Sequence, residues 1–193
     1  MPAIDPFQSR SKWRVLLPVT AAGAVGFLLT LMGVVRTPDG GLSSEELRVA
    51  VLQDHFRLQH AAIEYVRDTH ALPAPSFDIS EGTPSALSDA RLVPLAQQDG
   101  WHGPYLVPGL DRPTKASFWS LADAGALGPA ETGAAWGRLH RGYGEIDDET
   151  SQYIDQVLDD GDGATGSVRL TDTWIWFKLV ELPAETLAAS SLR

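Results

Sequence analysis

Residues 43–70 read SSEELRVAVLQDHFRLQHAAIEYVRDTH and carry the pattern from which the architecture follows. Ser43 and Glu46 form a Ser-x-x-Glu capping box, which predicts a helix start. From there to about His70 the apolar residues fall on two adjoining stripes of a helix. The stripes are Leu47, Val51, Leu58, Ala62, Tyr65 and Val49, Leu52, Phe56, Ile63, Val66. So wide an apolar arc predicts a helix wrapped by a sheet, an α+β fold.

Upstream, residues 15–35 read VLLPVTAAGAVGFLLTLMGVV, a run without charge between Arg14 and Arg36. A hydrocarbon core about 30 Å thick needs roughly 20 helical residues, so the run predicts a transmembrane helix. A cleaved secretory signal is the alternative. Its apolar core runs about 7–15 residues and ends at a small-x-small site, whereas Ala22-Gly23-Ala24 lies inside this run.

The residues beside this run set the predicted topology. Arg10, Lys12 and Arg14 precede it, whereas Asp39 and Glu45 soon follow it, which indicates a cytoplasmic N-terminus. The main domain then lies in the periplasm, on a single pass through the inner (cytoplasmic) membrane. The expected parts are a cytoplasmic arm 1–14, a transmembrane helix 15–36, a linker 37–43, an extracytoplasmic domain 44–182 and a C-terminal tail 183–193.

Small residues mark one face of the predicted membrane helix. Helices in lipid associate through close packing of small side chains, because hydrophobicity does not drive them together there. The expected packing face comprises Ala22, Gly26 and Thr30, four residues apart, with Gly23 and Gly33 nearby. This face predicts other membrane protein subunits as partners, in addition to membrane lipid.

Charge, cysteine content and missing motifs narrow the function. The formal net charge is −10; residues 1–14 carry +2, which leaves −12 on the rest and argues against nucleic acid binding through phosphates. The absence of cysteine excludes disulfides, thiol catalysis and cysteine-based metal centres. No hydrolase, phosphate-loop, zinc-protease or dinucleotide motif is present, and His55 and His60 are five apart, a spacing that makes no metal pair. We therefore expect a non-enzyme without cofactor or metal, with both histidines at the surface or hydrogen-bonded.

Beyond the long helix the pattern predicts short elements. Thr83-Pro84 opens a short helix as cap and first residue. Residues 104–107 and 117–121 predict two strands paired across a turn at 108–113. Residues 173–182 predict a last strand, in which Trp174, Trp176 and Lys178 share one face.

This order of parts resembles the type IV pilin and type II secretion pseudopilin family. Asp99, Trp101, Pro104 and Tyr105 keep the family's Asp-Pro-Trp-Gly-Asn-Pro-Tyr run, and the resemblance implies a structural role for them. It also implies a pilin-like long helix packed on an antiparallel sheet. Prepilins have a cleavage glycine before the span and a glutamate at its fifth position. Residues 12–19 contain neither, which favours an uncleaved, permanent anchor.

Residues 125–144, GALGPAETGAAWGRLHRGYG, predict a long glycine-rich loop. The loop holds residue types that are common in interfaces, which makes it a candidate partner contact. A flexible surface loop without a partner is the alternative. The candidate contact residues are Trp136, Arg138, His140, Arg141 and Tyr143.

The acidic run Asp159-Asp160-Gly161-Asp162-Gly163 has two interpretations. It resembles the acidic turn that some pilins carry before a last strand. A Ca²⁺ site is the other interpretation, although numbering an EF-hand from Asp160 puts threonine where the loop needs its glycine and its bidentate glutamate. A structural turn is therefore the main expectation.

Together these features predict a non-enzymatic, single-span accessory subunit that stabilises a larger membrane complex, such as a photosynthetic or other energy-transducing assembly. The alternative is a minor pseudopilin-like component of a type II secretion or type IV pilus system. A periplasmic hydrolase or a metal-dependent binder is a third, weaker possibility.

Overall fold

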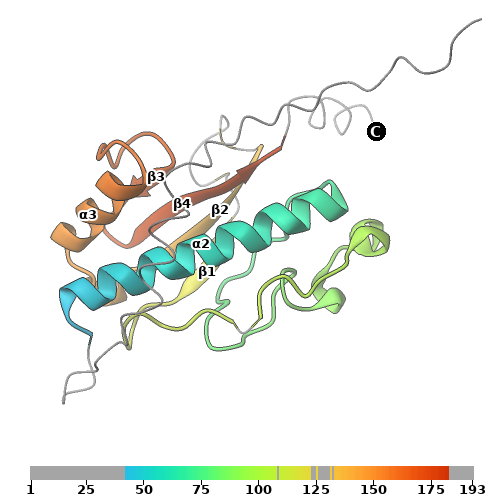
Figure 1. The fold of residues 1–193 in the computed structure, drawn as a ribbon, viewed down its shortest axis with the longest axis horizontal. Helices are drawn as coiled ribbons and strands as arrows, with labels where there is room; N and C mark the ends of the chain where they lie inside the picture. Colours follow the sequence, from blue (N-terminus) through green and yellow to red (C-terminus); the bar gives the residue numbers. More distant parts are fainter. Residues whose placement is uncertain (1–41, 108, 123–124, 126–130, 132, 183–193) are drawn as a thin grey trace, which may run out of the picture. The chain divides into compact units, whose positions relative to one another are not determined.

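Helix α2 (Ser44–Thr69) crosses one face of a four-stranded antiparallel sheet in the computed structural model, an α+β arrangement (Figure 1). The structure describes residues 42–107, 109–122, 125, 131 and 133–182. The strands lie in the order β1-β2-β4-β3, so the last strand in the chain is central. Their bounds are β1 Trp119–Ala122, β2 Ala134–His140, β3 Val168–Leu170 and β4 Trp174–Glu181. Short 3-10 helices are η1 Ala90–Leu92, η2 Leu95–Gly100 and η5 Gly142–Gly144.

Helix α2 begins and ends where the sequence predicts. The backbone N–H of Glu46 donates to Ser43 Oγ at 3.3 Å, and the N–H of Ser43 donates to Glu46 Oε2 at 2.8 Å. These two bonds satisfy N–H groups that a helix start leaves open. At the other end His70 takes a left-handed conformation, with φ 55°, and its N–H donates to Val66 O.

The core lies between α2 and the facing side of the sheet. Leu58 and Tyr65 from α2 are fully buried there, as are Trp119 and Phe177 from the strands. The expected width of the apolar arc is wrong in part, because Phe56 and Ile63 are exposed. A helix resting on a sheet buries one stripe fully; of the second stripe only Leu52 reaches the core.

Two short predictions between α2 and the sheet are wrong. The expected helix after Pro84 is replaced by a turn at 86–88 and by η1, because the Asp89 carboxylate caps the N–H of Arg91. Residues 104–107 are not a strand, since the N–H groups of Tyr105 and Leu106 both donate to Leu87 O. The predicted strand near 117–121 does form as β1, but it pairs with β2.

The expected loop at 125–144 is also wrong over much of its length, because Ala134–His140 form strand β2 between β1 and β4. Its small residues serve close packing under α2. A Cβ on Gly137 would lie 2.8 Å from Leu58 Cδ2. Glycine at position 137, a residue type that suggests a loop, therefore allows α2 to approach the sheet.

Near the end of the domain, helix α3 (Asp148–Leu158) is an element that the sequence analysis does not predict. Asp147 caps it by accepting from the N–H of Thr150 at 2.7 Å. Strand β4 confirms the prediction for the last strand: Trp174, Trp176 and Lys178 share a face, and the alternate residues Ile175, Phe177 and Leu179 lie in the core.

Among the helices of the described ranges, none has the length and apolar character needed to cross a bilayer. The predicted arm, the transmembrane helix with Ala22, Gly23, Gly26, Thr30 and Gly33, most of the linker, and the tail 183–193 lie outside those ranges. They stay predictions.

Candidate functional site

The face of the sheet opposite the core carries aromatic and cationic side chains in register. Strand alternation places every second residue of β2 and β4 on this outer face. Across the pair, Trp136 lies beside Lys178, Arg138 beside Trp176, and His140 beside Trp174. This face has a buried half around Trp136 and a partly exposed half around Arg138.

The buried half is a closed structural cluster. Trp136 is fully buried, with Lys178 Nζ 5.3 Å and Arg169 Cζ 5.8 Å from its ring centre. Glu131 balances both cations, at 2.7 Å from Arg169 Nη2 and 3.3 Å from Lys178 Nζ. Because its charges are paired and its ring is covered, this half offers little to a partner.

The partly exposed half is organised around Arg138, which is half-buried, as is Trp174, whereas His140 is buried. The guanidinium carbon of Arg138 lies 4.2 Å from the ring centre of Trp174 and 5.3 Å from that of Trp176, within cation–π range. Its Nε donates to Ser120 Oγ at 3.1 Å. Partial burial lowers the pKa of this guanidinium, which stays charged at neutral pH. In the described part of the chain no carboxylate lies in ion-pair distance of Arg138.

Aromatic rings extend from this arginine to the surface. His140 stacks on Phe118 with centres 5.0 Å apart and planes 9° apart, and meets Trp174 edge-on at 4.9 Å. Beyond them Tyr143 and Phe77 are exposed, at 93% and 70%. Each contacts a ring of the cluster, Tyr143 on His140 and Phe77 on Phe118. We call this set the aromatic patch: Phe77, Phe118, Arg138, His140, Tyr143 and Trp174.

The structure brings together three of the five predicted contact residues, namely Arg138, His140 and Tyr143. Trp136 lies in the buried half of the face. Arg141 is bound elsewhere: its Nη2 donates to Asp148 at 2.5 Å, and its Nε and Nη1 donate to backbone carbonyls. Phe77, Phe118 and Trp174 belong to the patch but are not among the predicted contact residues.

Two of the four residues of the family-like motif make contacts near the end of α2. Trp101 Nε1 donates to Ala86 O at 3.1 Å, and Tyr105 Oη donates to Asp68 Oδ2 at 3.0 Å. The two rings meet edge-on at 5.7 Å. Asp99 and Pro104, the other two motif residues, are exposed. The contacts of Trp101 and Tyr105 are those of structural residues.

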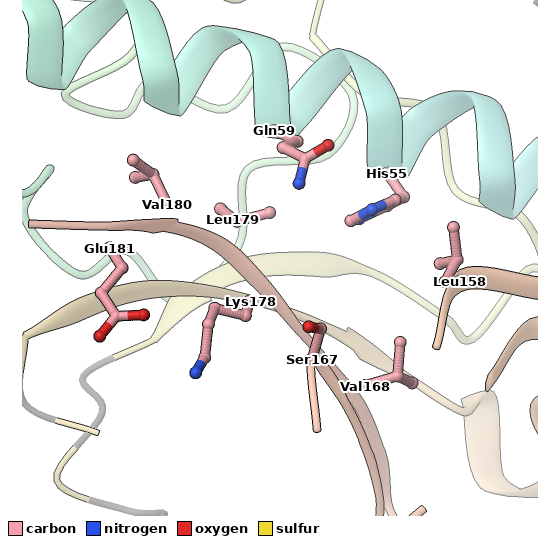
Figure 2. A pocket seen from close by; sticks show the side chains of 9 residues that line it. All are labelled: His55, Gln59, Leu158, Ser167, Val168, Lys178, Leu179, Val180 and Glu181. Carbon is pink, nitrogen blue, oxygen red and sulfur yellow. The ribbon is translucent and has the colours of Figure 1, made fainter. Parts of the chain in front are cut away.

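A hollow of about 270 Å³ lies between α2 and β4 (Figure 2). His55 and Gln59 point into it from α2, and Lys178 and Glu181 belong to the strand on its other side. His55 stacks on Phe177 at 4.9 Å, and burial lowers the pKa of its imidazole to about 4. Its Nδ1 is buried and finds no hydrogen-bond partner in the part of the chain that the structure describes, so the prediction of a surface or hydrogen-bonded histidine is wrong for this atom. The ring is neutral at pH 7 and is placed as a packing group.

No protein-family model, curated protein or solved structure matches this chain. The function therefore has to follow from the chemistry of its own residues.

Proposed function

We propose that this protein is a non-enzymatic, single-span accessory subunit that stabilises a larger membrane protein complex, such as a photosynthetic or other energy-transducing assembly. Its predicted membrane helix packs against other subunits in the bilayer, and its pilin-like domain binds them in the periplasm. The observation that carries the proposal is the aromatic patch.

Interface energy concentrates in tryptophan, tyrosine and arginine side chains that become buried on binding. The patch presents all three types, with Tyr143 almost fully exposed and Arg138 held on an indole. Arg138 has no carboxylate partner within the described residues, and in an acidic protein such an arginine is suited to an acidic group on another chain. These properties support a protein partner over a small-molecule substrate.

A minor pseudopilin-like role in a type II secretion or type IV pilus system is the second candidate. It is supported by a long helix laid on an antiparallel sheet and by the Trp101 and Tyr105 contacts at the helix end. The absence of the prepilin glycine and glutamate favours the first candidate. The identity of the subunits that co-purify with the chain in mild detergent, determined by mass spectrometry, separates the two.

The first prediction concerns the patch. Tyr143→Ala and Arg138→Gln in the full-length chain are each expected to reduce co-purification of partner subunits roughly 30-fold, the effect of an interface residue worth about 2 kcal/mol. The readout is quantitative mass spectrometry after mild detergent solubilisation. Tyr143 is 93% exposed, so its removal should leave the melting temperature unchanged.

Leu95→Ala is the matched control for the patch, because Leu95 is also exposed, at 83%, and is not a patch residue. It should keep the partners. If both patch variants co-purify as well as wild type, the patch is not the periplasmic contact.

The second prediction concerns the membrane helix. Gly26→Leu would hold neighbouring helix backbones apart without impairing insertion, since leucine is favoured in the bilayer. The variant should reach the membrane in normal amount and lose its partner subunits, whereas Leu28→Ala on another face should retain them. Normal co-purification of Gly26→Leu would leave the association to the outer domain alone.

A further inference from the structure

Asp155, in the last turn of α3, is a buried carboxylate without a partner. Its side chain has no exposed surface, and both carboxylate oxygens lack a hydrogen-bond donor within the described residues. A carboxylate removed from water and left unpaired costs several kcal/mol, so it either binds a proton or is compensated by a positive charge.

The charged groups that act on Asp155 are themselves acidic. Burial raises the pKa of Asp155, and repulsion by the carboxylates of Asp159, Asp160 and Asp162 raises it further. Helix α3 has no basic residue in its last turn, and its C-terminal end carries partial negative charge. Nothing among these groups supplies the missing positive charge.

The oxygens converge on one point. One carboxylate oxygen from each of Asp155, Asp159 and Asp160 lies within 4.8 Å of the other two. Backbone groups hold the two loop residues in place: Asp159 accepts from the N–H groups of Ser167 and Val168, and Asp160 accepts from that of Asp162. Gly166, with φ +81°, lets the backbone pass close to Asp159, because a Cβ there would lie 1.9 Å from Asp159 Oδ2.

We propose that Asp155, Asp159 and Asp160 bind a divalent cation, with Ca²⁺ as the preferred ion. Ca²⁺ binds oxygens at about 2.3–2.6 Å, so two of its ligands stand up to about 5 Å apart, and the observed spacing fits around one ion. Water and main-chain carbonyls complete its coordination. Mg²⁺ requires a tighter octahedron at about 2.0–2.1 Å and keeps more of its own water, so it should bind more weakly.

The proposed site adds a ligand role to the acidic run, for which the sequence predicts a structural turn. An EF-hand loop numbered from Asp160 includes only residues that follow Asp160. The buried ligand, Asp155, precedes it and lies on α3. Asp155 and Asp159 are four residues apart, the spacing of neighbours on one helical face. The site does not depend on the membrane anchor or on a partner subunit.

The test uses the full-length chain in detergent, titrated with CaCl2 after removal of bound metal with EDTA. Wild type should bind one equivalent of Ca²⁺ by calorimetry and melt about 5 °C higher in excess Ca²⁺, an effect that EDTA reverses. MgCl2 at the same concentration should raise the melting temperature less. Asp155→Asn and Asp160→Asn should each abolish the Ca²⁺ response.

Asp172→Asn is the charge-matched control, because Asp172 is an exposed carboxylate outside the cluster. It should respond to Ca²⁺ like wild type. If Asp155 instead carries a proton, wild type will not respond to Ca²⁺ and Asp155→Asn will melt at or above the wild-type temperature. Either that result or a full Ca²⁺ response in Asp155→Asn would overturn the proposal.

Discussion

Leu58→Ala is expected to lower the free energy of unfolding by about 2–5 kcal/mol, since it opens a cavity where α2 rests on the sheet. Leu58 is fully buried, and its Cδ2 lies 2.8 Å from the place of a Cβ on Gly137. Gly137→Ala alone should cost about 1–3 kcal/mol, because the new methyl group overpacks the same contact. The double variant should cost less than the sum, because the added methyl group enters the space that leucine vacates.

Urea unfolding of wild type, the two single variants and the double variant gives the coupling energy. Ile154→Val is a useful comparison, because Ile154 is fully buried on α3 and its change should simply add to that at Gly137. Strict additivity of Leu58→Ala and Gly137→Ala would mean that α2 does not meet β2 at this point.

Acidification should also have a large effect on stability. Two adjacent residues of α2, Asp54 and His55, change the free energy of unfolding in opposite directions as the pH falls. The pKa of His55 is lowered from 6.5 to about 4, so its stabilising contribution is present above pH 6.5 and is lost as pH falls through 4. The pKa of Asp54 is raised from 3.8 to about 6, chiefly by burial that Arg57 only partly offsets. Its contribution is present below pH 3.8 and is lost as pH rises through 6. Each shift corresponds to about 3 kcal/mol, in opposite directions.

Single variants should separate the pH-dependent contributions of His55 and Asp54 to stability. Relative to wild type, His55→Leu should gain about 3 kcal/mol of stability between pH 6.5 and 4, and Asp54→Asn should lose about as much. Urea unfolding at pH 6.5, 5 and 4 measures both differences, and other titrating groups cancel in the comparison. His60→Gln, at an exposed histidine, should follow wild type. If the free energy of unfolding of both His55→Leu and Asp54→Asn changes with pH as it does in wild type, the two pKa shifts do not affect stability as proposed.

The parts of the fold that sequence predicts are those with local causes. The Ser43 and Glu46 capping box lies within one helical turn, and the alternation of apolar residues in β4 lies within one strand. Both patterns can therefore be recognised from neighbouring residues in the sequence. Strand β2 is different. Gly137 is required there because Leu58 of α2 packs against it. Leu58 is far from Gly137 in the sequence, so the residues around Gly137 do not reveal this contact.

The same division holds for the candidate sites. The composition of residues 125–144 pointed to Arg138, His140 and Tyr143, but Trp174 joins them only through the register of β2 against β4. The sequence does not predict Asp155 as a ligand, because its burial depends on how α3 packs. Its spacing from Asp159 is visible in the sequence, although two aspartates four apart are common on exposed helices.

The central place of β4 in the sheet has a consequence for how the chain is made. Helix α2 leaves the ribosome early, yet the strand it lies across, with Phe177 in its contact, is among the last parts of the domain to emerge. Until Glu181 has been synthesised, the apolar face of α2 lacks β4, the strand that brings Phe177 into the core. Such long-range pairing slows folding and leaves nascent apolar surface open to wrong contacts. A holding chaperone that recognises an amphipathic helix would therefore matter for this domain during synthesis.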